Sequence, residues 1–459
     1  MSKPLTESLL QSLQQLLGDR FSLDEEILHE HGKDESSHSP IPPQAVCFPE
    51  REKEVVEVVK LCAAHRTPMI PFGKGTSVEG QVLAERGGVS IDLARMNRVL
   101  AVNENDLDAV VEAGVTRLEL NEHLAGSGLF FSVDPGADAT LGGMASTRAS
   151  GTNSVRYGTM RDNVLSVKVV LADGRIIQTA TRARKSSAGY DLTHLFVGAE
   201  GTLGIITELT VRLFASPEAI SSAVCPFPSV NSAVNTVIKT IQSAVPIARI
   251  ELLDSLQIEA VNKYSNLSCK VAPTLFMEFH GTESSVSEQS KKVEAIAHNH
   301  GGEDFQWSTA EAERKRFWQA RHDSYFAALN LRPGCRAMAT DVCVPISRLA
   351  ECITETEKDI ADSPLAITIL GHVGDGNFHL VIVLDTQNPA ELEEAHGINK
   401  RLVERALAMD GTCTGEHGIG IGKLDFLEQE LGVAVGVMRQ IKHALDPNNL
   451  MNPGKVLKG

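Results

Sequence analysis

Three glycine-rich loops constrain this sequence more than any other feature. They are Gly73-Lys-Gly-Thr-Ser-Val-Glu-Gly80, Asp134-Pro-Gly-Ala-Asp-Ala-Thr-Leu-Gly-Gly143 and Gly198-Ala-Glu-Gly-Thr-Leu-Gly204, and each enters or leaves a predicted strand or helix. A loop that exposes consecutive N–H groups, with no Cβ atoms in the way, can surround a pyrophosphate. Gly142-Gly143 also precedes a predicted helix, whose N-terminus favours an anion. Three such loops in one region predict a site for a nucleotide-like cofactor.

The familiar nucleotide motifs are missing. The sequence contains neither G-x-G-x-x-G nor G-x-x-x-x-G-K-[ST], which disfavours a Rossmann dinucleotide site and an NTP-hydrolysing P-loop. A hydrophobic fraction of 42% and a charged fraction of 22% are typical of a globular protein. The pattern changes near Ser216-Pro217 from turn-rich strands to alternating helices and strands. We therefore expect an N-terminal helical segment (1–38), a first domain (39–217) and a second domain (218–459).

Charge and cysteine usage restrict the partners and the compartment. The net charge of −16 makes a nucleic-acid partner unfavourable. The eight cysteines include no C-x-x-C pair, which indicates free thiols in a reducing compartment. The first residues show neither an apolar nor an arginine-rich leader pattern. The prediction is a cytoplasmic protein, and peripheral contact with a membrane stays open.

A pair of histidines brackets a predicted hairpin turn. His372 and His379 flank Asp375-Gly376, a favoured two-residue type I′ turn, which would place them directly opposite each other with Cβ atoms roughly 4.5–5.5 Å apart. Two imidazoles in this arrangement can bind one metal ion. Glu416, beside His417 in a glycine-rich loop, is the natural third ligand and leaves a coordination position for substrate. The ligand set fits zinc, and manganese or iron would also accept it.

Several motifs resemble a known flavoprotein superfamily. The segments 71–80, 135–143 and 198–207 resemble the FAD-binding domain of the vanillyl-alcohol-oxidase flavoproteins. The segments 371–379 and 414–420 resemble the FAD-linked D-2-hydroxyacid dehydrogenases, and most closely the D-lactate dehydrogenase (cytochrome) type. The resemblance implies an α+β fold with an FAD-binding domain of two α+β subdomains. It adds an α+β cap domain of the FAD-linked oxidase C-terminal type, with a last segment that returns to the FAD domain.

The resemblance also implies which residues bind FAD, without a covalent bond. The first loop would hold the pyrophosphate, the second the ribityl and flavin region, and the third the adenosine and ribityl parts. The implied residues are Pro71, Gly73, Lys74, Gly75, Thr76, Ser77, Gly80, Pro135, Gly136, Thr140, Gly142, Gly143, Ser150, Gly151, Gly158, Glu200, Gly201, Gly204 and Ile205. The resemblance assigns metal binding to His372, His379 and Glu416, the same residues that spacing suggests.

Two further residues are candidates for the chemistry of 2-hydroxyacid oxidation. His417 is the candidate general base, because imidazole titrates near neutral pH, and its alternative role is to orient Glu416. Arg321, in a helix predicted over 311–331, matches the carboxylate-binding arginine of the family. A guanidinium group suits a carboxylate because it can donate two parallel hydrogen bonds, and its alternative role is a solvated surface charge.

Two departures from the family pattern concern the substrate. Family members that oxidise dicarboxylates have a basic residue before Thr340-Asp341, where this chain has Ala337-Met-Ala339, and a polar Asn where it has Val381. Both favour D-lactate, oxidised to pyruvate with electrons passed to a cytochrome, a quinone or an electron-transfer flavoprotein. The alternatives are a D-2-hydroxyglutarate or glycolate dehydrogenase of the same family, and a non-catalytic flavin-binding subunit.

Overall fold

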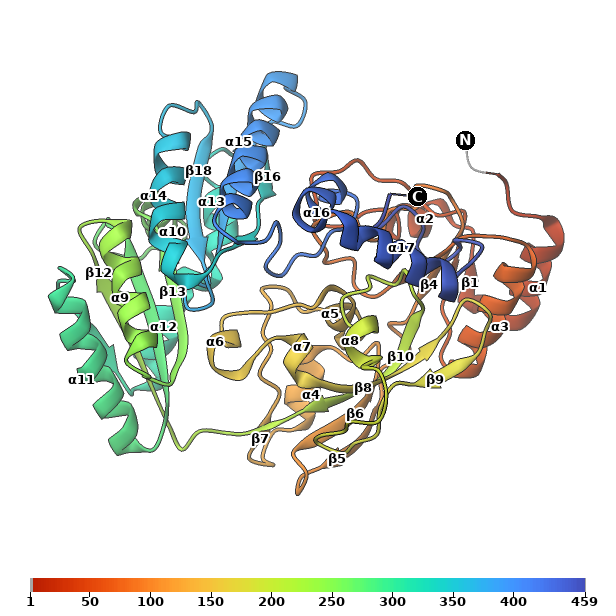
Figure 1. Ribbon diagram of the computed structural model, residues 1–459, viewed down its shortest axis with the longest axis horizontal. Coiled ribbons are helices and arrows are strands. Elements are labelled where there is room, and N and C mark those ends of the chain that lie inside the picture. The colour runs from red at the N-terminus through yellow and green to blue at the C-terminus, as the bar shows by residue number, and fades with distance from the viewer. Residues whose placement is uncertain (1–2, 459) are drawn as a thin grey trace. The chain divides into compact units, whose positions relative to one another are not determined.

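The chain forms two compact units that each combine helices with sheets. The computed structural model describes residues 3–458 (Figure 1). Unit 1 comprises the described residues up to Ser150, Gly158–Ser216 and the described residues from Glu416 onward; unit 2 comprises Gly151–Tyr157 and Pro217–Gly415. The predicted α+β class is confirmed. No helix among residues 3–458 is both long and apolar enough to cross a membrane.

The first sheet of unit 1 is largely parallel. Its strand order is β1-β2-β4-β3, in which β2 and β3 run parallel to β4 and β1 runs antiparallel to β2. Helix α3 (Glu52–Ala64) joins β2 to β3 and buries its apolar side. Helix α1 (Glu7–Leu17) packs against α3. The other elements are η1 (Gly18–Arg20), β1 (Phe21–Ser22), α2 (Glu25–Glu30), β2 (Ala45–Cys47), β3 (Met69–Phe72) and β4 (Val89–Asp92).

The second sheet of unit 1 is antiparallel, with the order β5-β6-β10-β8-β9. Most residues of β10 (Ile205–Arg212) are buried, as expected for a central strand. A capping box at Thr116 begins α4 (Arg117–His123). The other elements are β5 (Val99–Asn103), β6 (Asp108–Glu112), β7 (Leu129–Phe130), α5 (Leu141–Thr147), α7 (Met160–Asn163), β8 (Val164–Val170), β9 (Ile176–Gln178), α8 (Thr193–Phe196) and β11 (Phe214–Ala215), which pairs with β7.

The last part of the chain completes unit 1. Met451 forms a parallel bridge to Met69 of β3. Asn452 Nδ2 donates hydrogen bonds to two backbone carbonyls of unit 1, and the buried Lys455 donates to Leu83 O at 2.6 Å. Lys442 Nζ donates to Thr202 O at 2.7 Å. The C-terminal segment therefore belongs to the first unit, and its helices are α16 (Leu424–Leu431) and α17 (Val433–Leu445).

Unit 2 is built on one eight-stranded sheet. The order is β15-β12-β14-β13-β18-β19-β16, and β17 pairs with β19 beside this path. Every pairing in it is antiparallel. The strands are β12 (Ala219–Pro226), β13 (Ile247–Leu253), β14 (Thr274–Gly281), β15 (Gln306–Ser308), β16 (Arg336–Ala339), β17 (Val342–Cys343), β18 (Ala366–Gly371) and β19 (Asn377–Leu384).

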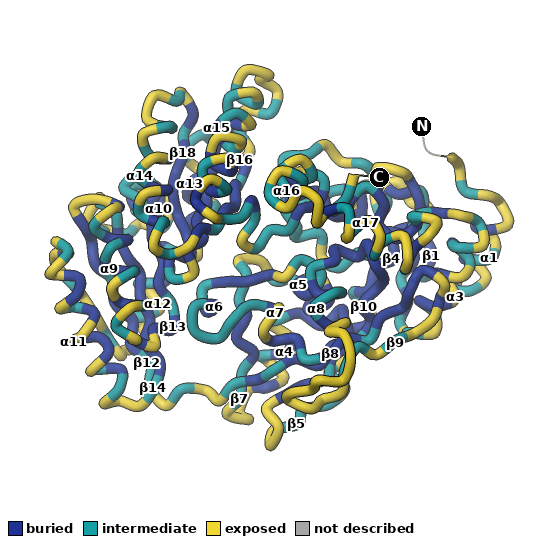
Figure 2. Tube along the Cα trace, viewed as in Figure 1, coloured by how far each residue is buried: buried dark blue, intermediate teal, exposed yellow. Residues whose placement is uncertain are grey.

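Helices cover this sheet and bury one side of their surface. Figure 2 shows largely buried strands and helices that alternate between buried and exposed positions, as the spacing of Val230, Ala233, Val234 and Val237 requires in α9. The helices are α6 (Ser154–Tyr157), α9 (Val230–Gln242), α10 (Ser255–Tyr264), α11 (Glu283–Asn299), α12 (Glu311–His322), α13 (Ser324–Leu329), η2 (Ile346–Arg348), α14 (Leu349–Ile360) and α15 (Pro389–Ala408). The prediction of a single helix over 311–331 is wrong. The structure has two helices there, α12 and α13, which are separated at Asp323, and the side chain of Asp323 bonds to Ser265 and Gln319.

The hairpin formed by β18 and β19 differs from the predicted register. Leu370 pairs with His379, so His372 lies opposite Asn377 and the predicted two-residue turn is wrong. Residues 373–376 form a longer loop, in which Gly376 has a φ of +83° and accepts a hydrogen bond from Val344 N at 3.0 Å. A register shift of two residues keeps every side chain on its face. The two histidines therefore still share one face of the hairpin.

A buried polar chain fixes α6 within unit 2. Tyr157 Oη lies 2.6 Å from His280 Nδ1, and His280 Nε2 lies 2.9 Å from Glu278 Oε1. Ser222 donates to the other oxygen of Glu278 at 3.1 Å, and Arg249 Nε lies 3.5 Å from Oε1. These partners compensate a carboxylate that is only 5% exposed.

Lowering the pH is expected to destabilise unit 2 through Glu278. Burial alone would raise the pKa of this carboxyl, but Arg249, His280 and Ser222 stabilise its charged form and lower the pKa from 4.5 to about 2. A depressed pKa stabilises the fold above the unfolded-state pKa, and this contribution of about 3 kcal/mol is lost as the pH falls towards 2. Urea unfolding at pH 7 and pH 2.5 should show a larger loss for the wild type than for Glu278→Gln. Equal losses would contradict this role.

Candidate functional site

The predicted histidine pair lies at the end of the β18–β19 hairpin in unit 2. The ring centroids of His372 and His379 are 5.6 Å apart, with the ring planes at 85°. Both side chains are buried, with 7% and 6% exposure. The flanking apolar strands pack in the core of the sheet and hold the two rings in place. The hairpin therefore brings the two predicted metal ligands together without a directly opposed pairing.

Each ring is oriented through its Nδ1 atom. His372 Nδ1 donates to Glu251 Oε1 at 2.7 Å, and His379 Nδ1 donates to the backbone oxygen of Thr340 at 2.9 Å. A neutral imidazole with its proton on Nδ1 carries its lone pair on Nε2. Carboxylate and carbonyl partners of this kind are the usual support of metal-binding histidines. The donor set in unit 2 therefore fits a divalent transition metal.

Arg321 approaches the same group through Glu251. Its Nε atom donates to Glu251 Oε2 at 2.7 Å. Within residues 3–458, the two terminal nitrogens of Arg321 donate no hydrogen bond to a protein acceptor. Burial alone would raise the pKa of the Glu251 carboxyl, but His372 and Arg321 hold it below its ordinary value. Arg321 is thus a cation held at Nε, whose two terminal nitrogens carry four N–H donors that bond to no protein acceptor among the described residues.

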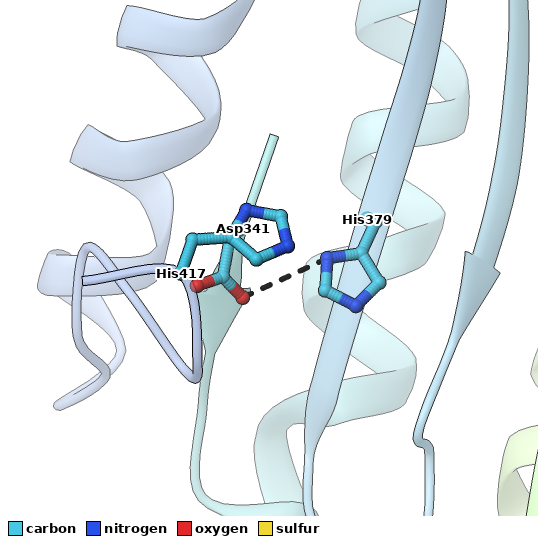
Figure 3. A group of neighbouring side chains, drawn as sticks. All are labelled: Asp341, His379 and His417. Carbon is cyan, nitrogen blue, oxygen red and sulfur yellow. Dashed lines mark ion pairs between the residues drawn. The ribbon is translucent and has the colours of Figure 1, made fainter. Parts of the chain in front are cut away.

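Asp341 connects the second histidine to the end of unit 2. This fully buried carboxylate lies 3.6 Å from His379 Nδ1, the pair joined by the dashed line in Figure 3. Asn377 Nδ2 donates to its Oδ1 at 2.7 Å, while Thr414 Oγ1 and Gly415 N donate to its Oδ2 at 2.7 and 2.8 Å. Asp341 therefore fixes the two residues that immediately precede Glu416 in the chain.

The two positions that bear on substrate choice are neighbours. Ala339 of β16 pairs directly with Val381 of β19. Val381 is two residues beyond His379 on the same strand, so both side chains lie on one face of the sheet. Small apolar groups therefore border the histidine pair at this point.

The three glycine-rich loops converge in unit 1. A Cβ on Gly73 would lie 2.4 Å from Thr140 Oγ1, which belongs to the second loop. A Cβ on Gly201, where φ is +72°, would lie 2.9 Å from Pro71 Cγ, at the start of the first loop. Glycine is required at both positions because any side chain would separate the loops.

The first loop offers a row of backbone donors. Among residues 3–458, no protein acceptor receives a hydrogen bond from the N–H groups of residues 73–77. Half-buried amides without protein partners, in a loop that contains two glycines, fit the pyrophosphate of FAD. Asp34 supports the loop, because its Oδ2 accepts from Ser77 Oγ at 3.1 Å and from Gly80 N at 2.9 Å. Asp34 was not among the predicted site residues, because it lies in the predicted N-terminal helical segment (1–38).

The loop that carries Glu416 and His417 is held by polar side chains of unit 1. Glu200 accepts hydrogen bonds from Ile419 N at 2.7 Å and Gly420 N at 2.8 Å, and burial raises the pKa of its carboxyl. Gln81 Nε2 donates to His417 O at 2.8 Å. Ser150 Oγ donates to Glu416 Oε2 at 2.7 Å. The backbone of this loop and the carboxylate of Glu416 are therefore both fixed.

The predicted residues divide between the two units. His372, His379 and Arg321 lie in unit 2, whereas Glu416 and His417 lie in unit 1. Of the predicted FAD-binding residues, Gly151 lies in unit 2 and the others lie in unit 1. The sequence analysis assigned no role to Glu251 or Asp341. A lone acidic residue in the apolar segment 250–253 was the signal for Glu251.

Family models match two separate parts of the chain. The FAD binding domain matches residues 43–180, and the C-terminal domain of the FAD linked oxidases matches residues 216–456. The chain belongs to the FAD-linked oxidase family. This member of the family is an FAD-dependent oxidoreductase, so the predicted family, the FAD cofactor and the enzyme class are confirmed.

The chain is also similar to individual curated proteins and to solved structures. The probable mitochondrial D-lactate dehydrogenase of Danio rerio is 53% identical over 98% of this chain and 92% of its own length. The mitochondrial D-lactate dehydrogenase (cytochrome) of Arabidopsis thaliana is 46% identical over 99% of this chain and 81% of its own length. A glycolate oxidase subunit of Bacillus subtilis is 33% identical over 90% and 89%. P-cresol methylhydroxylase has a TM-score of 0.84 at 20% identity over 99% and 98%, which confirms the predicted vanillyl-alcohol-oxidase-type fold.

The predicted cytoplasmic location is wrong for this oxidase. The D-lactate dehydrogenase relatives from Danio rerio and Arabidopsis thaliana are mitochondrial proteins. The prediction relied on dispersed cysteines, and free thiols are compatible with any reducing compartment.

Replacing Asp34 by Ala should weaken FAD binding. The variant loses the acceptor that holds Ser77 and Gly80, so the row of amides in residues 73–77 becomes mobile. Because a hydrogen bond to a charged group contributes about 1.5–3 kcal/mol, we expect at least a roughly tenfold rise in the Kd for FAD, measured by flavin fluorescence after dialysis. Asp24→Ala, which removes the N-cap of α2, is the matched control and should retain wild-type affinity. Equal affinity of both variants would contradict a supporting role for Asp34.

Proposed function

We propose that this chain oxidises D-lactate to pyruvate, with non-covalently bound FAD as the hydride acceptor and a divalent metal ion as a second cofactor. The observation that carries the proposal is the pair of imidazoles in unit 2, each oriented through Nδ1, together with an arginine whose two terminal nitrogens donate to no protein acceptor among residues 3–458. The D-lactate dehydrogenase relatives support the substrate. The direct pairing of Ala339 with Val381 supports a short, apolar substrate tail over a second carboxylate.

The metal ion would be held by His372, His379 and Glu416. The first two residues present Nε2 lone pairs, and zinc, manganese and iron all accept imidazole. Glu416 follows directly on Gly415, whose backbone Asp341 anchors in unit 2. When bound, FAD supplies hydride acceptance and the cation supplies Lewis acidity.

The protein side chains would bind the substrate and remove its hydroxyl proton. The terminal nitrogens of Arg321 would hold the lactate carboxylate through two parallel hydrogen bonds. An imidazole nitrogen of His417 would accept the hydroxyl proton, because imidazole changes charge near neutral pH. The FAD would be held by the glycine loops of unit 1, with its pyrophosphate at the amides of residues 73–77.

The relatives also suggest where the electrons go. The Arabidopsis thaliana relative is named a cytochrome-type, mitochondrial enzyme. We extend both properties to this chain: a mitochondrial location and a cytochrome as the electron acceptor. A quinone or an electron-transfer flavoprotein as the preferred acceptor would contradict the second of these.

Anaerobic mixing with substrate tests the activity directly. The purified chain should be yellow, and D-lactate should bleach its flavin absorbance, whereas L-lactate, D-2-hydroxyglutarate and glycolate should act at least about tenfold more slowly, a difference of about 1.4 kcal/mol in the barrier. A chain that holds FAD and is not reduced by D-lactate would contradict the proposed substrate. Faster bleaching by glycolate would favour the hypothesis of a glycolate dehydrogenase.

Replacing His372 by Ala tests the metal. This variant should lose the bound metal and its turnover, because one of three ligands is gone, while the flavin spectrum stays because the glycine loops are unchanged. Metal content per flavin, measured by elemental analysis, is the readout. His298→Ala, on the surface of α11, is the matched control. Unchanged turnover after a chelator has removed all metal would contradict the role.

A further inference from the structure

One carboxylate in unit 2, that of Glu251, bonds both to the proposed metal ligand His372 and to the proposed substrate anchor Arg321. Glu251 is 1% exposed, and both of its oxygens accept hydrogen bonds of 2.7 Å. Oε1 accepts from Nδ1 of His372 and Oε2 accepts from Nε of Arg321. The first partner is the proposed metal ligand and the second is the proposed anchor of the substrate carboxylate.

The sheet explains why Glu251 reaches His372. Strand β13 pairs antiparallel with β18, with Leu252 opposite Gly371 and Leu253 opposite Leu370. Continuing this register by one residue places Glu251 opposite His372. Directly opposed side chains share a face of the sheet and come close enough to bond. Arg321 reaches the other oxygen from α12, near the end of that helix.

The two hydrogen bonds restrict both partners. The bond to Nδ1 selects the His372 tautomer with its lone pair on Nε2 and makes that nitrogen a stronger ligand. The bond to Nε fixes the plane of the Arg321 guanidinium, and with it the plane in which the two terminal nitrogens lie. One carboxylate therefore sets the geometry of two groups with different tasks.

We propose that Glu251 is a positioning residue that orients His372 for metal binding and Arg321 for substrate binding. This inference rests on the proposed function, since it assigns a metal to His372 and a substrate carboxylate to Arg321. Glu251 contacts neither the metal nor the substrate. Its effect is exerted through the two residues that it holds.

Substitution of Glu251 by Gln separates this role from general stability. A glutamine side chain has one acceptor and one NH₂ donor, so it can accept from His372 or from Arg321 but not from both. Its NH₂ group then faces the remaining N–H donor. Glu251→Asp keeps the charge and both oxygens but shortens the side chain by one methylene, so it should recover part of both functions.

The adjacent strand offers a matched control. Glu278 is also a buried carboxylate, with His280 on one oxygen and Arg249 nearby, but it has no place in the proposed site. Glu278→Gln therefore removes a comparable buried ion pair. It controls for the loss of stability that any such change produces.

The experiment measures metal and substrate separately on the full chain loaded with FAD. After treatment with a chelator, zinc chloride is titrated by calorimetry, and the KM for D-lactate is then measured at saturating zinc. We expect Glu251→Gln to raise the Kd for zinc about 10- to 100-fold where His372 loses its acceptor, the usual effect of losing such a partner, and to raise KM about tenfold or more where Arg321 loses it. Glu251→Asp should lie between, and Glu278→Gln should match the wild type in both quantities.

Several results would overturn the inference. They are wild-type values of both quantities for Glu251→Gln, equal losses in Glu278→Gln, and a wild-type chain that binds no zinc. If Glu251→Gln does not fold, as judged by circular dichroism, the comparison of Glu251→Asp with Glu278→Asp decides. If D-lactate does not reduce the wild-type flavin, the proposed function fails, and the zinc titration alone then supports or overturns the role of Glu251.

Discussion

Glu251 places a negative charge near the centre of an apolar sheet, where water cannot solvate it. Such a charge is tolerated only when its oxygens are hydrogen-bonded and its charge is compensated, which Arg321 and His372 provide together. The compensation also fixes both partners. The same requirement recurs at Asp341, which is fully buried and bonded to Asn377, Thr414 and Gly415. The chemistry proposed for unit 2 therefore depends on buried carboxylates whose energetic cost is met by the groups that they position.

The local patterns of the sequence were sufficient for much of this framework. The capping box at Thr116 and the apolar spacing in α3 and α9 are visible in the sequence itself and coincide with helices, because the forces involved act within a few residues. The hairpin at residues 371–379 was predicted with the right strands and the wrong register. A type I′ turn at Asp375-Gly376 was the local optimum, but Val344 binds Gly376 O and a longer loop results. Because Val344 is distant in the sequence, no local pattern could have revealed this contact.

The residues missed by the sequence analysis are those that act through others. The glycine, histidine and arginine candidates could be found from the sequence because these residue types bind phosphate, metal or carboxylate groups directly. Asp34 holds the first glycine loop from a segment more than forty residues away, and Glu251 holds His372 from another strand. Their roles depend on strand order and loop packing, which a single sequence without a structure does not specify. An acidic residue in an apolar run was the only signal available for Glu251.

The contacts of Met451, Asn452 and Lys455 also determine the order in which this chain can be completed during synthesis. Residues 217–415 are contiguous and, apart from α6, contain all of unit 2, so this part can assemble as soon as it leaves the ribosome. Unit 1 begins first and yet lacks the Met451 bridge on the outer side of β3 until residues 451–455 are translated. Loss of residues 451–455 would therefore damage the unit whose first strands are made earliest.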